Sequence, residues 1–370
     1  MKKVMFLCGS LEIGKDGVGD YTRKLGLELV NQGHEVKIVA LNDHITAERL
    51  ESIIINANQE IEVVRFPSTL TWENRIAKLD RLLNIFNPDW VSLQYVAYSF
   101  QPKGIPYQFA KSLKQISKRW RWHIMFHETW LGISGLSPLK HKIVGFFQRK
   151  VIQLVFQSVN PEKVSTSNRL YQMVLAKADI PTSVIPLFSN IPIITTCPNF
   201  EQELFDKLSI TALNRNDYTI LGIFGRLHKG FDFESVINEE LIKAKSFNKT
   251  LIFLSFGKIE DVGEFNKLKS LFESKIEFHL LGELPEEKIS STLQLLDTGI
   301  SCTPLEHIGK SGVYAAMRLH NVKVLLPFSD EIPEFESEII SYNNYLHSRP
   351  LHKWGVDYIA LKFVKFLKTN

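Results

Sequence analysis

Short apolar runs alternate with longer amphipathic stretches along almost the whole chain. Short apolar runs bounded by turn residues are typical of buried strands, whereas the longer stretches repeat their apolar positions at helical spacing. Regular alternation of the two is typical of β–α–β units, in which helices cover a parallel sheet. The sequence therefore predicts an α/β protein.

Two series of such units are predicted, one on each side of a segment at residues 181–198 that is rich in Pro, Ile, Thr and Ser and reads as a linker. A chain of 370 residues suits two domains of ordinary size. We expect two doubly wound sheets in series, whose strand ends can face one central cleft. The expected strands are 4–8, 35–40, 61–66, 90–93, 123–126 and 163–166, then 219–224, 250–256, 277–281, 298–302 and 323–326, and the expected helices are 20–32, 74–84, 106–118 and 138–157, then 233–245, 264–272, 286–296, 312–319 and 353–367.

Composition narrows the class of protein. Hydrophobic residues make up 44% and charged residues 23%, which is typical of a globular protein with enough apolar material for two cores. The net charge of +4 suits an anionic small ligand and is too weak to predict nucleic-acid binding. The three cysteines are far apart and predict neither a disulfide framework nor a zinc site. We expect a cytoplasmic protein, because the first apolar run is too short for a signal peptide and no run is long enough to span a membrane.

Ligands of doubly wound sheets bind beyond the carboxyl ends of the strands, so the residues that follow each strand are the candidates for chemistry. After the first strand, Gly17 and Gly19 precede a helix, where a close backbone and free N–H groups suit an anion. The dinucleotide fingerprint G-x-G-x-x-G would need a third glycine where Thr22 stands, which argues against NAD or FAD. A flexible turn explains the spacing equally well.

His127 follows the strand at 123–126, where an active site of this architecture would lie. A histidine there can form a hydrogen bond with a sugar hydroxyl, although a purely structural histidine fits the pattern too. After the strand at 219–224, Arg226 and Lys229 are flanked by glycines and suit a diphosphate, since arginine offers a bidentate grip and lysine a point charge. A solvated basic turn is the alternative.

The segment after the strand at 298–302 opens the helix at 312–319. Glu306 can accept hydrogen bonds from sugar hydroxyls and Lys310 can pair with phosphate, while an ordinary helix cap remains the alternative. The order of residues is not that of a Walker A loop. Backbone donors at the helix start are expected at Gly309, Ser311 and Gly312.

Together these segments resemble the family 4-like glycosyltransferases of the GT-B fold. The resemblance covers nearly the whole chain, in the right order, although each motif is only moderately specific. The matching runs are Gly17-Val18-Gly19-Asp20-Tyr21-Thr22, Gly33-His34-Glu35-Val36, Phe224-Gly225-Arg226-Leu227 with Lys229-Gly230, Leu281-Gly282-Glu283-Leu284-Pro285, Asp297-Thr298-Gly299-Ile300 and Pro304-Leu305-Glu306.

The resemblance implies a retaining, metal-independent transfer of a hexose from a nucleotide-diphosphate sugar, which acts as substrate, with no cofactor. Residues 1–185 would form a Rossmann-like domain on the acceptor side and 186–350 a donor domain, and a helix in 351–370 would cross back to the first domain. His127 would approach the donor sugar, Glu306 would hold its hydroxyls and Leu284 would lie near the base. The diphosphate would be held by Arg226 and Lys229, with Gly19 and the amides near 309–311 completing the cradle.

Two departures from the family pattern are visible. The family places a second glutamate eight residues after the first, often to bind ribose, whereas Tyr314 stands there in this chain. Arg226 and Lys229 are also closer together than is usual. A nucleotide-sugar epimerase of the same architecture and a catalytically silent homologue that binds a nucleotide sugar therefore remain alternatives.

The acceptor is left open between a glycan, a lipid-linked sugar and a small molecule. Residues 137–159 mix Lys140, Lys142 and Lys150 with apolar residues, a pattern that suits peripheral contact with the inner surface of a membrane. The alternative is a helix that packs its apolar residues into its own domain and exposes a basic face.

Overall fold

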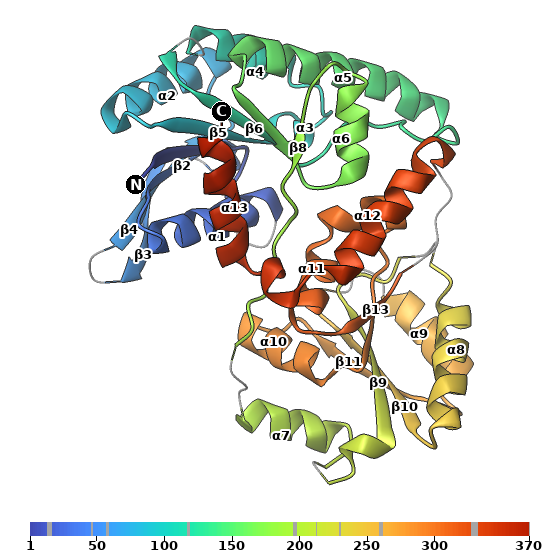
Figure 1. Ribbon diagram of the computed structural model, residues 1–370. Coiled ribbons are helices and arrows are strands. Elements are labelled where there is room, and N and C mark those ends of the chain that lie inside the picture. Colours follow the sequence, from blue (N-terminus) through green and yellow to red (C-terminus); the bar gives the residue numbers. More distant parts are fainter. Residues whose placement is uncertain are drawn as a thin grey trace. The chain divides into compact units, whose positions relative to one another are not determined.

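The computed structural model describes residues 1–12, 17–45, 47–56, 59–116, 119–194, 198–211, 213–228, 231–258, 262–326 and 332–369 (Figure 1). The chain divides into two compact units. Unit 1 comprises Met1–Pro186, Asp330–Tyr342 and Val356–Asn370, and unit 2 comprises Leu187–Ser329 and Asn343–Gly355. The boundary after Pro186 lies within the segment expected as a linker, whereas 330–342 groups with unit 1 although the sequence placed it in the second domain.

Unit 1 contains an eight-stranded sheet in the order β3-β4-β2-β1-β5-β6-β7-β8. All neighbouring strands run parallel except β3, which pairs antiparallel with β4. The hairpin strand β3 was not predicted. The strands are β1 (Lys3–Cys8), β2 (Glu35–Asp43), β3 (Arg49–Asn56), β4 (Gln59–Pro67), β5 (Trp90–Tyr95), β6 (Trp122–Phe126), β7 (Lys163–Thr166) and β8 (Ser183–Val184).

Helices cover both faces of this sheet because its central strands are buried throughout. Met5 and Leu7 of β1 face a core shared with α2, α4 and α5. On the opposite face, Phe6 stacks on Phe363 of α13, with ring centroids 5.7 Å apart, and α13 lies beside α1 (Figure 1). The helices are α1 (Gly17–Asn31), α2 (Trp72–Phe86), α3 (Ala97–Phe100), α4 (Tyr107–Ser112), α5 (Leu139–Val159), α6 (Arg169–Ala176) and α13 (Val356–Lys368).

Unit 2 contains a five-stranded parallel sheet in the order β11-β10-β9-β12-β13. Its strands are β9 (Tyr218–Phe224), β10 (Thr250–Phe256), β11 (Glu277–Gly282), β12 (Thr298–Ile300) and β13 (Lys323–Leu325). The helices α8 and α9 cover one side of the sheet and α10 the other (Figure 1). The helices of unit 2 are α7 (Pro198–Lys207), α8 (Phe233–Ser246), α9 (Val262–Phe272), α10 (Glu286–Leu295) and α11 (Gly312–Leu319), and its 3-10 turns include η4 (Leu305–Lys310) and η6 (Leu351–Trp354). The helix α12 (Glu336–Ser348) begins in unit 1 and ends in unit 2.

Each sheet has a point at which the strand order reverses. In unit 1 the reversal lies between β1 and β5, and in unit 2 it lies between β9 and β12. The connections on the two sides of such a point leave in opposite directions, which opens a crevice at the carboxyl ends of the two strands where ligands bind. The residues that follow β1, β5, β9 and β12 are therefore the ones best placed for function.

The helices of the described ranges include none with both the length and the apolar character needed to cross a bilayer.

Candidate functional site

The loop that follows β1 is held in place by a buried carboxylate at the end of β2. Asp43 accepts hydrogen bonds from the Ser10 hydroxyl (3.0 Å) and the Leu11 amide (3.2 Å), and it pairs with Arg65 Nε at 2.6 Å. Burial alone would raise the pKa of Asp43, but the hydrogen bonds from Arg65 and Ser10 and the charge of Arg65 lower it below its usual value. The carboxylate is therefore ionised and fixes Ser10 and Leu11, the part of the loop that directly follows β1.

Glycine is required where α1 meets this loop. A Cβ atom built on Gly19 would lie 2.5 Å from the carbonyl oxygen of Ser10. Among the described residues, no atom lies within 4 Å of the corresponding position at Gly17, two residues earlier. Gly19 thus lets the helix start pack directly on Ser10, whereas the close approach of a ligand expected from the sequence stays a prediction for both glycines.

His127 lies directly after β6, at the carboxyl edge of the unit 1 sheet, and is 7% exposed. Its Nε2 atom lies 2.9 Å from Oε1 of Gln94 on β5. An amide oxygen only accepts, so His127 carries its proton on Nε2 and presents Nδ1 as an acceptor. The ring also meets Tyr21 of α1 edge-to-face, with centroids 5.0 Å apart.

A chain of buried hydrogen bonds continues from Gln94 across the sheet. Gln94 Nε2 donates to the Ser92 hydroxyl at 2.8 Å, and this hydroxyl lies 2.8 Å from His123 Nδ1. The other ring nitrogen of His123 lies 2.8 Å from the Ser165 hydroxyl on β7. Three strands are thereby linked behind His127, which fixes the orientation of Gln94 and, through it, that of the imidazole.

Both histidines are neutral at physiological pH. Burial lowers the pKa of His127 to about 3. Burial, and then repulsion from a charge on His127, lowers the pKa of His123 to about 3 as well. His127 can therefore orient a ligand hydroxyl, but it brings no positive charge to the site.

In unit 2, three neighbouring strands end on glycines with left-handed backbone. Gly225 follows β9 with φ 91°, Gly257 follows β10 with φ 89°, and Gly282 ends β11 with φ 72°. Such angles strain any residue with a Cβ atom. A Cβ atom built on Gly225 would meet Val313 at 3.9 Å, which places the turn after β9 beside the start of α11. This edge is lined by backbone that a ligand can approach closely.

The start of α11 is capped by Ser311. Its hydroxyl accepts the Tyr314 amide at 3.2 Å and the Thr303 hydroxyl at 3.0 Å. Gly309 is buried and Gly312 is the first residue of α11, with the Asn190 amide nitrogen 3.8 Å from where its Cβ atom would lie. The positive end of the helix dipole therefore lies at the switch point of this sheet.

Acidic and basic side chains of unit 2 gather at the same edge. Glu306 lies in η4 and is 5% exposed, and Lys310 ends that turn half-buried. The turn is held from behind by Asn343, which donates to the Leu305 carbonyl at 3.2 Å. Arg226 is exposed after β9. The segments that carry Arg226 and Glu306 thus flank the reversal between β9 and β12.

The structural support for two other predicted site residues, Leu284 and Lys229, is weaker. Leu284 follows β11, the edge strand, and is half-buried at the far end of the same carboxyl edge. Lys229 lies outside the described residues, so its expected contact with a diphosphate stays a prediction.

Tyr314 does not reach the ligand edge of the sheet. It is fully buried, with its ring edge-to-face with Trp354 at 5.4 Å and His347 at 6.0 Å. Burial raises the pKa of its hydroxyl to about 12, against the opposing charges of Arg318 and Arg349. The residue that replaces the expected second glutamate is therefore part of the packing between α11 and η6.

Sequence reasoning missed three residues that the structure brings to these edges: Gln94 beside His127, Tyr21 against the same ring, and Asn190 beside Gly312. Gln94 alternates with Leu93 and Tyr95, a pattern that by itself predicts a solvent-facing side of the strand, whereas the structure buries this side. Asn190 lies in the segment read as a linker. Tyr21 had a signal, since it follows Gly19 by two residues on the same helix start.

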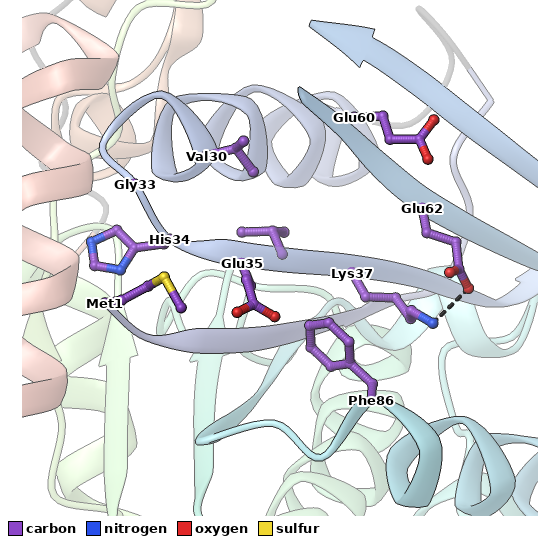
Figure 2. A pocket seen from close by; sticks show the side chains of 10 residues that line it. Met1, Val30, Gly33, His34, Glu35, Lys37, Glu60, Glu62 and Phe86 are labelled. Carbon is purple, nitrogen blue, oxygen red and sulfur yellow. Dashed lines mark ion pairs between the residues drawn. The ribbon is translucent and has the colours of Figure 1, made fainter. Parts of the chain in front are cut away.

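A pocket of about 480 Å³ lies at the opposite, amino-terminal edge of the unit 1 sheet (Figure 2). Its lining includes Glu35, paired with Lys3 at 3.0 Å, and Lys37, paired with Glu62 at 2.5 Å. The predicted site residues do not line it. In the described ranges no group of three or more His, Cys, Asp or Glu side chains is arranged to hold a metal ion.

Comparison with protein-family models gave no match, and comparison with curated proteins gave none either. Solved structures do match along the whole chain. A glycosyltransferase from Rickettsia africae ESF-5 has a TM-score of 0.58 at 13% identity, with 100% of both chains covered. The catalytic domain of starch synthase IV from Arabidopsis thaliana, solved with ADP and acarbose, has a TM-score of 0.53 at 11% identity, covering 99% of this chain and 98% of that one.

The chain has the GT-B fold. A UDP-GlcNAc 2-epimerase from Neisseria meningitidis bound to UDP-GlcNAc also shares it, with a TM-score of 0.50 at 12% identity and 100% of both chains covered. The prediction of two Rossmann-like sheets is thereby confirmed. At these identities the likeness establishes the fold alone, because one GT-B scaffold carries both transferases and epimerases.

Proposed function

We propose that this GT-B protein is a glycosyltransferase that moves a hexose from a nucleotide-diphosphate sugar to a hydroxyl acceptor. The observation that carries the proposal is the pairing of Arg226 with the segment from Glu306 to Gly312 on the two sides of the switch point of unit 2. A cation, a helix start and a buried carboxylate at one sheet edge suit the phosphates and the sugar of such a donor. The GT-B neighbours solved with ADP or UDP-GlcNAc support the same donor class.

In the proposed reaction the bond between the anomeric carbon and the diphosphate oxygen breaks, the acceptor oxygen forms the new bond, and the proton of the acceptor hydroxyl passes to the leaving diphosphate. Negative charge grows on the diphosphate as it leaves. Arg226, Lys310 and the amides at the start of α11 stabilise that charge, which is the main catalytic task in a metal-independent transfer. Glu306 accepts hydrogen bonds from donor-sugar hydroxyls, and Leu284 at the β11 end lies against the base. Lys229 is proposed as a further phosphate ligand.

Unit 1 supplies His127 in the proposed mechanism. Because the imidazole is neutral with Nδ1 as an acceptor, it orients a hydroxyl of the donor sugar without repelling the positive charge that develops near the anomeric carbon. Gly19 keeps the adjoining loop close-packed. We further propose that the stereochemistry is retained, in line with the family 4-like motifs around Gly19, Arg226 and Glu306.

The test begins with binding. A thermal-shift screen of nucleoside diphosphates and their sugars identifies the base, since a ligand of the folded state raises its melting temperature by mass action. Turnover of the stabilising donor is then followed with a panel of acceptors. We expect Arg226→Ala, Glu306→Ala and His127→Ala each to lower turnover by more than about tenfold, the usual size of such losses.

Matched controls are Arg119→Ala, which is exposed, and Glu240→Ala and His320→Ala, which are buried away from both switch points. They should leave turnover within about twofold, since they remove no group from the sheet edges. Unchanged turnover in all three site variants would contradict the site assignment. Absence of both binding and turnover for every nucleotide sugar would contradict the transferase itself.

The burial of Tyr314 favours one alternative, a homologue that binds a nucleotide sugar without transferring it, because no acid is present there for the ribose. The same experiment separates the alternatives. A silent homologue binds the donor but neither hydrolyses nor transfers it. An epimerase inverts one carbon of the donor sugar with no acceptor present, which NMR of the donor detects.

A further inference from the structure

The helix α5, labelled in Figure 1, has one buried face and one exposed face. Its inner face buries Gly145, Gln148, Ile152 and Val155, which repeat at helical spacing. Its outer face, at spacings of four, three and one residues, exposes a row of large apolar side chains. Together with Leu136 just before the helix they form the α5 apolar stripe: Leu136 (82% exposed), Leu139 (73%), Ile143 (51%), Phe146 (57%) and Phe147 (50%).

Contacts within unit 1 prevent α5 from rotating about its axis to bury the α5 apolar stripe. A Cβ atom built on Gly145 would lie 1.8 Å from the Leu131 carbonyl oxygen, so the preceding loop sits directly on the helix backbone. Gln148 accepts the Leu131 amide at 2.9 Å from the same inner face. The rotation of α5 is therefore fixed by contacts within unit 1, and the stripe stays outside.

Positive charge surrounds the stripe. Lys140 and Lys142 flank it on either side of the helix, and Lys150 lies over the Phe146 ring at 5.8 Å. All three lysines are exposed. The sequence has no Asp or Glu from Thr129 to Pro161. A surface that fits here must offer both negative charge and an apolar layer.

We infer that the α5 apolar stripe is a docking surface for an anionic lipid bilayer. The apolar side chains would enter the boundary between headgroups and acyl chains, while the lysines remain among anionic headgroups. A second copy of the chain fits less well, because symmetric pairing of this face would place lysines against lysines with no acid between them. Nucleic acid offers the charge but no apolar layer for five large hydrophobic side chains.

The test is flotation of the full chain with vesicles of phosphatidylcholine alone and of phosphatidylcholine with phosphatidylglycerol. We expect binding only to the anionic vesicles, weakened by salt. The double variant Ile143→Ser with Phe146→Ser and the double variant Lys140→Glu with Lys142→Glu should each lower the vesicle affinity by at least about tenfold, since apolar burial and headgroup attraction act together.

Two matched controls lie in unit 2. Ile242→Ser with Phe247→Ser removes two apolar side chains that are more exposed (68% and 75%) than Ile143 and Phe146 (51% and 57%), and Lys267→Glu with Lys269→Glu reverses two exposed lysines at the same spacing. Both should bind anionic vesicles as the unaltered chain does. The inference is overturned if the stripe variants bind anionic vesicles as well as their controls do. It is also overturned if the unaltered chain binds single-stranded DNA but no vesicles, or if it forms a dimer in solution that the stripe variants dissociate. None of these readouts depends on transferase activity.

Discussion

The two site edges of this protein are built by opposite means. In unit 1 the edge is made of buried side chains. Asp43 is fully buried, His127 is 7% exposed, and hydrogen bonds to Ser10 and Gln94 hold them in place. In unit 2 the edge is made of backbone, with glycines at positive φ after β9, β10 and β11 and a capped helix start. Its cation Arg226 is exposed.

The difference assigns different physical tasks to the two edges. A buried network fixes the position and the charge state of one side chain, which suits orientation of a neutral group. Bare backbone and an exposed cation allow close approach of a charged group that brings its own counter-charge. We therefore expect substitutions of the residues that hold the unit 1 edge together, such as Arg65 and Gly19, to cost mainly stability, and those at the unit 2 edge to cost mainly ligand affinity.

The largest expected effect comes from Arg65→Met. It leaves the Asp43 carboxylate buried without its cation, which costs about 3–5 kcal/mol of unfolding free energy. The matched change in unit 2, Arg215→Met, breaks an ion pair with Asp297 whose side chain is 41% exposed, and should cost about 1 kcal/mol. Urea denaturation measures both. Arg215 and Asp297 precede β9 and β12, at the amino-terminal edge of the unit 2 sheet, so this partly exposed pair is a reference for the effect of burial. Equal costs would contradict the conclusion that the burial of Asp43 makes its ion pair costly to break.

Glycines at the two helix starts give the next effect. Gly19→Ala places a methyl group 2.5 Å from the Ser10 carbonyl oxygen, and we expect it to lower the unfolding free energy by about 1–3 kcal/mol. Among the described residues, the added methyl group of Gly312→Ala meets only Asn190, at 3.8 Å, and the variant should change the unfolding free energy by less than about 0.5 kcal/mol. Thermal denaturation of the two variants gives their melting temperatures. A lowered melting temperature for Gly312→Ala would show that the start of α11 is packed as tightly as the start of α1.

The smallest effect is a dependence on pH. The pKa of His123 is about 3 in the folded chain and near 6.5 when unfolded, so the unfolded chain binds more protons between these values. Stability is therefore complete above pH 6.5 and is lost as the pH falls, by about 1.4 kcal/mol per pH unit for each such histidine. His123→Gln should make the fall between pH 6.5 and 5 less steep by that amount.

His141→Gln is the control for this experiment, because His141 is exposed on α5. Calorimetry at several pH values supplies the measurement. If His123→Gln leaves the slope as steep as His141→Gln does, the interior of unit 1 tolerates a charged imidazole, and the argument for a neutral His127 weakens with it.

Much of the fold could be predicted because parallel strands buried on both faces leave clear apolar runs. The strand at 163–166 and the helix at 312–319 were predicted to the residue. The strand β3 was missed because it is an edge strand that pairs antiparallel with β4, outside the β–α–β alternation on which the other strand predictions rest. The helix α12 was missed because its sequence is polar on most sides. The helix α7 was missed because Pro198 was read as a break, although proline is favoured at a first helical position.

From the sequence, the candidate site could be predicted only for residues that directly follow a strand. His127, Arg226 and Glu306 follow strands, so topology alone places them at sheet edges. Gln94 could not be found this way, because its role depends on a partner 33 residues away in sequence. The burial of Tyr314 could not be predicted either, because it results from packing against Trp354, which is 40 residues away in sequence.

The placement of α13 has a consequence for how the protein is made. Phe363 and Phe366 lie against His123 at 5.2 and 5.9 Å, and Phe363 stacks on Phe6 of the first strand. Translation produces all of unit 2 before these two phenylalanines leave the ribosome. Until then, the part of this face that lies beside α1 stays uncovered in the amino-terminal half of the chain. Nascent chains stalled before residue 356 should therefore recruit chaperones that chains released after residue 368 no longer need.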